Sequence, residues 1–129
     1  MSIATYNVHV ISRSFVDQTA DEILHIMKAP FGGMTILAAY AIADTTFDAD
    51  GSNYYTVSLI DGGADGTGTT SMGSVGGASV DWTADTAKTL TLTQTGLDEG
   101  DWLHVKYDEE GTVAPGEVTI CIHWTQGGT

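Results

Sequence analysis

One local pattern recurs along the chain: a short run in which apolar and polar residues alternate, followed by a cluster of Gly, Asp, Ser or Thr. Alternation with a period of two places one set of side chains on a core and the other set in solvent or against a partner. Many such runs separated by turn residues predict an all-β sandwich or barrel. The clearest runs are Tyr54–Ile60, Thr89–Thr95, Trp102–Tyr107 and Glu117–Thr125.

The full pattern predicts about eight antiparallel strands in a single domain that covers residues 1–129. This number of strands favours a jelly-roll-like β-sandwich. An immunoglobulin-like sandwich is the alternative, although Cys121 is the only cysteine and the disulfide of antibody-type domains is missing. The other expected strands are Thr5–Phe15, Glu22–Lys28, Met34–Ala43 and Thr69–Met72, and the full bounds expected for two of the runs above are Lys88–Thr95 and Asp101–Asp108.

Three segments allow more than one interpretation. The spacing in Glu22–Lys28 also fits two helical turns, but its β-branched residues and the following proline favour a strand. The apolar run Met34–Ala43 is interpreted as a central strand buried on both faces, with its alanines leaving a helix as the alternative. Residues 1–20 form either a first strand or a docking arm, and 126–129 a flexible tail. We also expect Trp82 to pack inside the domain.

Charge restricts the possible partners. The chain has 4 Lys and Arg against 17 Asp and Glu, a formal net charge of −13. Nucleic acid and anionic membrane surfaces are therefore not expected as partners, because both are bound through basic residues. Residues 1–43 are close to neutral, whereas residues 44–129 hold most of the acidic side chains. This asymmetry led us to expect that part of the first third lies against another protein.

The N-terminal sequence MSIATYNVHV lacks a basic segment and a long apolar run, so no signal peptide is predicted. No stretch approaches the roughly 18 apolar residues that span a bilayer. A lone cysteine means that folding does not depend on an oxidising compartment.

Metal sites were considered at three places. The four histidines all lie in expected strands, and Cys121 shares a strand face with His123, but no CxxC or HxxxH spacing is present. Asp48–Asn53 and Asp61–Gly66 place oxygen ligands as calcium loops do, without the acidic residues of a full loop. Tight turns explain both, and we expect neither a metal nor another cofactor. The histidines are His9, His25, His104 and His123.

Catalytic residues are not expected, and the chain is predicted not to be an enzyme. The acidic groups at Asp98, Glu99 and Asp101 and at 108–110 are typical of solvated turns. The sequence has no GxSxG elbow, and the glycine-rich Asp61–Gly77 lacks the GK[ST] ending of a phosphate loop. Aromatic residues that could line a sugar-binding face, or the core, are Trp82, Trp102, Trp124, Tyr40, Tyr54, Tyr55 and Tyr107.

The order of several segments resembles one known family. An apolar strand after a double glycine (Gly32–Ala43) is followed by a Gly/Thr-rich loop (Tyr55–Thr69), an LTLT strand (Ala87–Thr95) and a GDWLHVKY strand (Leu97–Tyr107). A last strand, Gly116–Thr125, ends in an aromatic residue and a Gly-rich tail. Over most of residues 32–128 this order resembles the small decoration, or cement, proteins of tailed bacteriophages, whereas residues 1–31 match nothing we know.

The resemblance implies a structural virion protein that is made in the host cytoplasm and docks on the outside of the capsid. Its expected partner is the major capsid protein, and it is expected to act as a homotrimer. The family brings no catalytic residues. Two alternatives stay open, a virion-exposed carbohydrate-binding module and a tail or fibre component with the same fold.

Overall fold

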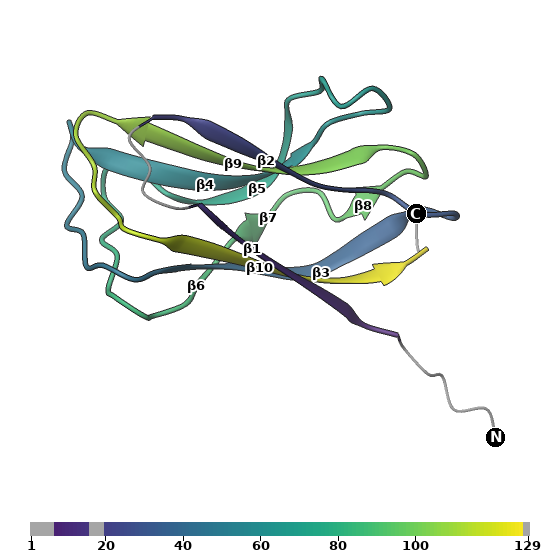
Figure 1. The fold of residues 1–129 in the computed structure, drawn as a ribbon, viewed down its shortest axis with the longest axis horizontal. Helices are drawn as coiled ribbons and strands as arrows, with labels where there is room; N and C mark the ends of the chain where they lie inside the picture. Colours follow the sequence, from purple (N-terminus) through teal and green to yellow (C-terminus); the bar gives the residue numbers. More distant parts are fainter. Residues whose placement is uncertain (1–6, 16–19, 128–129) are drawn as a thin grey trace.

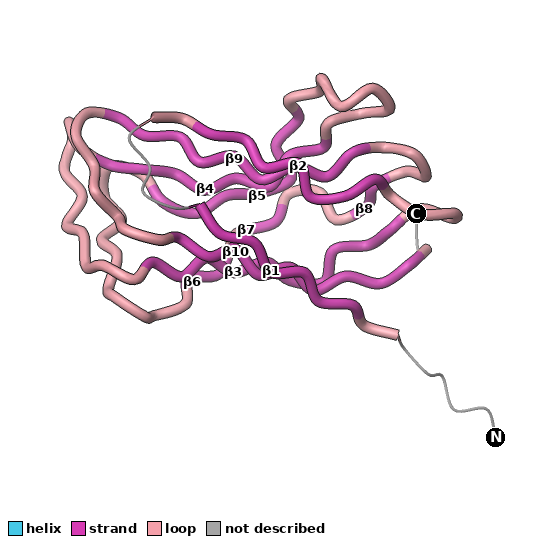
Figure 2. The backbone as a smooth tube through the Cα atoms, viewed as in Figure 1, coloured by secondary structure: helices cyan, strands magenta, loops and turns pink. Residues whose placement is uncertain are grey.

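The protein is built from two antiparallel sheets that face each other (Figure 1). A computed structural model describes residues 7–15 and 20–127, and within them all regular structure is strand (Figure 2). Those residues contain no helix that could span a membrane. Sheet A contains β1 (His9–Phe15), β10 (Val118–Gln126), β3 (Met34–Ala43), β6 (Lys88–Thr89) and β8 (Gly96–Leu97). Sheet B contains β2 (Glu22–Lys28), β9 (Trp102–Glu110), β4 (Tyr54–Asp61), β5 (Thr70–Gly76) and β7 (Thr91–Leu92).

The strand order is that of a jelly roll. Sheet A runs β1-β10-β3-β6, with β8 also paired to β3, and sheet B runs β2-β9-β4-β5-β7. The first half of the chain therefore pairs with the second half in reverse order: β1 with β10, β2 with β9, β3 with β6 and β8, and β4 with β5. An antiparallel ribbon rolled up in this way gives a double-sheet jelly roll, so the predicted fold class is confirmed.

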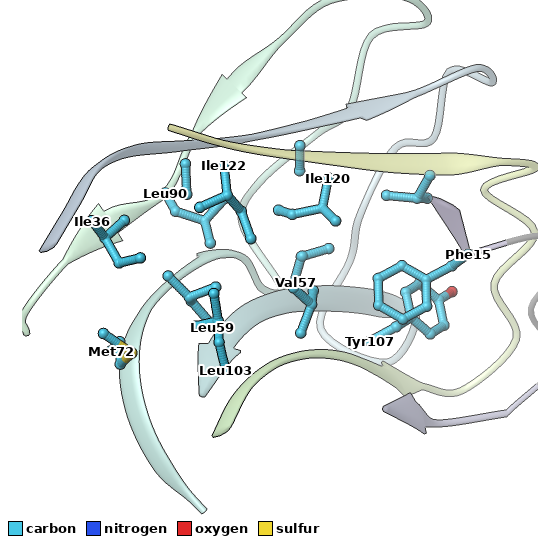
Figure 3. Close-up of a cluster of buried hydrophobic side chains, with 14 of the residues drawn as sticks. Phe15, Ile36, Val57, Leu59, Met72, Leu90, Leu103, Tyr107, Ile120 and Ile122 are labelled. Atoms are coloured by element: carbon cyan, nitrogen blue, oxygen red, sulfur yellow. The ribbon is translucent and has the colours of Figure 1, made fainter. Parts of the chain in front are cut away.

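The core lies between the sheets and comes from the inward half of each alternation. On β10, Val118, Ile120 and Ile122 are fully buried, while the residues between them are half-buried. Figure 3 shows Ile120 and Ile122 on the opposite side of the core from Val57, Leu59 and Leu103 of sheet B. Each such side chain contributes roughly 1.5–3 kcal/mol on burial, which makes the sheet-to-sheet contact the main source of stability.

One end of the core is aromatic. Tyr55 and Trp82 stack with ring centroids 4.6 Å apart, and Tyr55 also lies 5.4 Å from Tyr107. Trp82 comes from the connection between β5 and β6, where it forms a two-residue bridge with Phe47. Its side chain is 1% exposed, which confirms that Trp82 packs inside. Around Trp82, residues 80–84 contribute only this bridge.

The predicted strand Lys88–Thr95 is wrong as a continuous element. β6 pairs with β3 in sheet A, whereas β7 pairs with β5 in sheet B. The chain crosses between the sheets at Leu90, whose backbone N–H donates to the Ala39 carbonyl and whose side chain is buried. The crossing needs an apolar residue that faces the core. Alternation in Lys88–Thr95 does not reveal that the first part of this segment pairs with one sheet and the second part with the other.

Met34–Ala43 was predicted to be a central strand buried on both faces. The central position is confirmed, and the burial of both faces is wrong. β3 lies between β10 and the short β6 and β8, so it is an inner strand of its sheet. Its inward residues are buried, but Leu37, Ala38, Tyr40 and Ile42 face away from the core and are half-buried or exposed. Among the described residues, other elements cover only the inward face of this apolar strand.

The first expected strand is confirmed over its described part, and the last strand extends further than expected. His9–Phe15 is a strand with seven paired residues, so this part of residues 1–20 is a first strand, while 1–6 and 16–19 lie outside the described residues. The predicted flexible tail 126–129 is wrong for its first two residues. Gln126 ends β10 and donates from Nε2 to the Phe31 carbonyl, and Gly127 N–H donates to Gly33. Residues 128–129 lie outside the described part.

The aromatic end of the core generates a stability prediction. The Tyr55 hydroxyl is buried with no hydrogen-bond partner among the described residues, whereas Tyr107 donates to Glu109 Oε2 at 3.5 Å. Because a buried unpaired hydroxyl costs roughly 1–3 kcal/mol, Tyr55→Phe should raise the free energy of unfolding by about 1 kcal/mol in urea titrations. Tyr107→Phe, the matched control, should show no gain, and a clear loss for Tyr55→Phe would contradict this account.

Candidate functional site

The outward side of sheet A carries no charge. We call this surface the uncharged face. Strand register places the alternate residues of β1, β10 and β3 on it, because cross-strand partners point to the same side of a sheet. Hydroxyl side chains lie between its apolar residues. The uncharged face consists of Val10, Ser12, Ser14, Thr119, Cys121, His123, Leu37, Ala38, Tyr40 and Ile42.

A register irregularity adds to the apolar character of this face. The pairing of β3 with β10 shifts between His123 and Trp124, so His123 faces Ala38 while Trp124 faces Ile36. Leu37 is the extra residue in the shift and is 50% exposed. Val10 on the neighbouring edge strand is 58% exposed. Exposed apolar side chains on one face are a feature of surfaces that bind partners, so the uncharged face is a candidate docking surface.

The acidic residues are distributed unequally between the two sheets. The strands of sheet A contain no Asp or Glu, although the chain has 17 of them. The strands of sheet B carry Glu22, Asp61 and the three acidic residues at 108–110. The remaining described acidic residues lie in loops. A protein of net charge −13 therefore offers one broad surface that another molecule can approach without meeting a carboxylate on the strands.

The edge of sheet A beside this face is open. Among the described strands, β1 pairs only with β10 and leaves its other side unpaired. An unpaired strand edge can accept a strand from another chain. Arg13 projects from this edge, and its Nη1 lies 3.5 Å from the His25 carbonyl oxygen of β2 in the other sheet. The near-neutral first third of the chain supplies β1 and β3, which form much of the uncharged face.

The outward side of sheet B has a different character and holds a pocket of about 200 Å³. The connection between β4 and β5 forms one wall, and Figure 1 shows it as a teal loop that projects beyond the sheets at the top. Backbone hydrogen bonds from Gly62 to Trp102 and from Gly68 to Gly62 fix this loop beside β9. The pocket is lined by Ile23, Ser58, Ile60, Gly68, Thr69, His104, Lys106 and Asp108.

His104 lines the pocket and pairs with His25 of β2. His25 Nδ1 lies 3.0 Å from His104 Nε2, and the two rings meet edge to face. His104 is only 2% exposed. Burial, and secondarily the neighbouring His25, lowers the pKa of His104 below its usual value, so the neutral ring is favoured. Gly62 lies directly against this ring, where even a Cβ atom has no room.

The alternation in Trp102–Tyr107 places Trp102 on the same side of its strand as His104 and Lys106, and in the structure Trp102 is half-buried there. Pairing of His25 with His104 was not predicted, because 79 residues separate them and only the register of β2 against β9 brings them together. Alternation in each of the two strands predicts which face of the sheet its histidine lies on. It does not predict which residue of another strand lies next to that histidine.

The residues considered as metal ligands are divided between the two sheets. His123 and Cys121 share the uncharged face, and His9 stacks on Trp124 at 4.5 Å, whereas His25 and His104 form the pair in sheet B. Within residues 7–15 and 20–127, no group of three or more His, Cys, Asp or Glu side chains could hold a metal ion.

In both candidate calcium loops, carboxylate oxygens accept hydrogen bonds from other groups of the protein. Asp50 Oδ1 accepts from the backbone N–H groups of Ser52 and Asn53, and these bonds lower the pKa of Asp50. Asp61 Oδ1 accepts from Gly63 N–H, and Oδ2 accepts from Gln94 Nε2. These contacts are those of Asx-type turns.

The aromatic residues do not form a sugar-binding platform. Trp82, Tyr55 and Tyr107 belong to the core, and Trp124 is 8% exposed. Tyr40 lies on the uncharged face against His123, with ring centroids 5.4 Å apart. Trp102 and Tyr54 are each half-buried on sheet B. The aromatic side chains considered for a binding face are thus divided between the core and both outer faces.

The acidic groups considered for catalysis also have structural partners. Glu99 Oε1 accepts from Gly32 N–H at 2.8 Å, and the Glu109 N–H donates to Asp21 Oδ1 at 2.9 Å. Partial desolvation, followed by the negative charges of Asp61 and Asp98, raises the pKa of Asp101 above its usual value. These contacts connect turns and strand ends to neighbouring segments.

The buried histidine predicts a dependence of stability on pH. Since the folded-state pKa of His104 is lowered, its contribution to stability is complete above its ordinary value of 6.5 and is lost as pH falls below that value. His104→Gln should destabilise the protein at pH 8, and the difference from the wild type should narrow at pH 5. Urea unfolding at both pH values measures this, with His123→Gln on the other sheet as control. A constant difference would contradict the prediction.

The close approach of Gly62 to His104 predicts a steric effect. A Cβ at Gly62 would lie 2.7 Å from His104 Cε1, so Gly62→Ala should displace the ring and break its contact with His25. We expect a loss of about 1–3 kcal/mol in thermal or urea unfolding. Gly51→Ala is the matched control, because nothing lies within 4 Å of that position. Equal stability of the two variants would refute the proposed packing.

We compared the whole chain with protein-family models, with curated proteins and with solved structures. No family model, no curated protein and no solved structure matches it.

Proposed function

We propose that this protein is a structural virion component: a decoration, or cement, protein that binds the outer surface of a tailed-phage capsid and stabilises the lattice of the major capsid protein. The observation that carries the proposal is the uncharged face on a protein of net charge −13. The resemblance over residues 32–128 supplies the identity of the partner. Jelly rolls occur in viral capsid proteins, lectins and cupins, so the fold alone does not select this role.

The uncharged face has the properties that a docking surface needs. Leu37 and Val10 are large apolar side chains that are half or more exposed, and burying them against a partner is favourable. Serine and threonine side chains around them can form hydrogen bonds at the border of the contact. Carboxylates on sheet B and in the loops would then point away from the capsid.

Stabilisation of the shell follows from mass action. A protein that binds assembled subunits, and not dissociated ones, shifts the equilibrium toward the assembled lattice. We propose that it binds as a homotrimer, because several linked contacts increase the total affinity beyond that of one face. The open edge of β1, next to the uncharged face, is available for contacts between copies.

The proposal predicts a face-specific effect on capsid binding. Leu37→Asp places a charge in the centre of the contact and should weaken co-sedimentation with capsids that lack the protein at least tenfold, a loss of about 1.4 kcal/mol or more. Ser74→Asp, an exposed position on sheet B, is the matched control and should bind as the wild type does. Equal losses for both variants would argue against docking through sheet A.

Sedimentation velocity of the wild-type protein tests the assembly separately. A trimer that co-sediments with capsids is expected. A monomer that ignores capsids but binds tails or fibres would overturn the capsid assignment and favour the tail-component alternative. Point variants are preferable to deletion of residues 1–20, because that deletion removes all of β1 together with the buried Phe15.

A further inference from the structure

The pocket on sheet B is not used by docking through sheet A. It opens on the opposite side of the sandwich, between β2, β9, β4 and the β4–β5 loop. Its volume of about 200 Å³ is below the range of about 300–1,000 Å³ that is usual for drug-sized ligands. The space therefore suits one ring-sized group.

The pocket presents polar atoms that have no hydrogen-bond partner among the described residues. No other atom of the described residues hydrogen-bonds to the side-chain hydroxyls of Ser58 and Thr69. Asp108 uses Oδ2 to bind Lys106 Nζ at 3.1 Å, and no partner within the described chain contacts its Oδ1. Two hydroxyl groups, a carboxylate oxygen and an ammonium group thus border one small space, where they can accept and donate hydrogen bonds.

The same space has an apolar side. Ile60 is 8% exposed, and Ile23 on the neighbouring β2 is 49% exposed. Such side chains can contact the C–H groups of a ligand, while the polar groups orient it. A ligand with both kinds of surface on one ring fits this lining better than a wholly apolar molecule does.

The charges of the lining select against ions. Lys106 and Asp108 neutralise each other, and His104 is buried next to His25. An anion would meet the Asp108 carboxylate, and a cation would meet the Lys106 ammonium. The lining as a whole is therefore matched to an uncharged ligand.

We propose that this pocket binds a neutral polyhydroxylated ligand of the size of one sugar ring. Its hydroxyl groups bond to Asp108, Lys106, Ser58 and Thr69, and its C–H face lies on Ile60 and Ile23. This site goes beyond the docking role proposed above, because it lies on the other sheet and remains open when sheet A is covered.

NMR titration of the full chain tests the proposal. Amide signals of the 15N-labelled protein are followed while D-glucose, D-galactose, D-mannose or N-acetyl-D-glucosamine is added up to the tens of millimolar, with acetate and glycine as charged comparison ligands. We expect saturable shifts at β4, β9 and the β4–β5 loop with at least one sugar. The titration uses the isolated protein without capsids, so its result does not depend on whether the protein docks on a capsid.

Two variants identify the site. Ser58→Phe fills the pocket and should weaken sugar binding at least tenfold, whereas Thr91→Phe, exposed on β7 two strands away, should leave it unchanged. Asp108→Asn keeps the shape of the side chain and should also weaken sugar binding. This variant tests the site even if Ser58→Phe does not fold. Absence of saturable shifts with every sugar, saturation by acetate or glycine alone, or undiminished binding to folded pocket variants would overturn the proposal.

Discussion

The pairing of β3 with β10 is the interaction on which the rest of the structure depends. This ladder runs from Ala43 opposite Val118 to Met34 opposite Gln126, and it joins segments that are far apart in the chain. Its inward residues supply much of the core of sheet A, and its outward residues supply most of the uncharged face. A slip by one residue would exchange the two sets, so the same register fixes both stability and the candidate docking surface.

The distribution of charge follows from this arrangement. Seventeen acidic side chains must be placed on a small protein, and the structure puts those of the described residues on sheet B and in loops. Like charges at short range would oppose association of any two copies or of an acidic partner. The strands of sheet A hold no carboxylates, so this electrostatic repulsion is absent from one face. The acidic surfaces elsewhere repel unrelated anions.

The two outer faces differ in how they could be recognised from sequence. Alternation in β10 separates the inward Val118, Ile120 and Ile122 from the outward Thr119 and Cys121 without any structure. In β3 both sets are apolar, so the pattern suggested burial on both sides, and only the assembled sandwich shows that nothing in the described chain covers the second side. The pocket has still less sequence signal, because its lining comes from three strands and a loop.

The sequence by itself determined the all-β class, the positions of most strands and the acidic character, because period-two alternation and turn residues are local properties. It also placed Trp102, His104 and Lys106 on one face. Tertiary structure decided which strands pair, where Leu90 crosses between the sheets, and that His25 meets His104. These features depend on register between distant segments, and register is set by how all the inward side chains fill one common core.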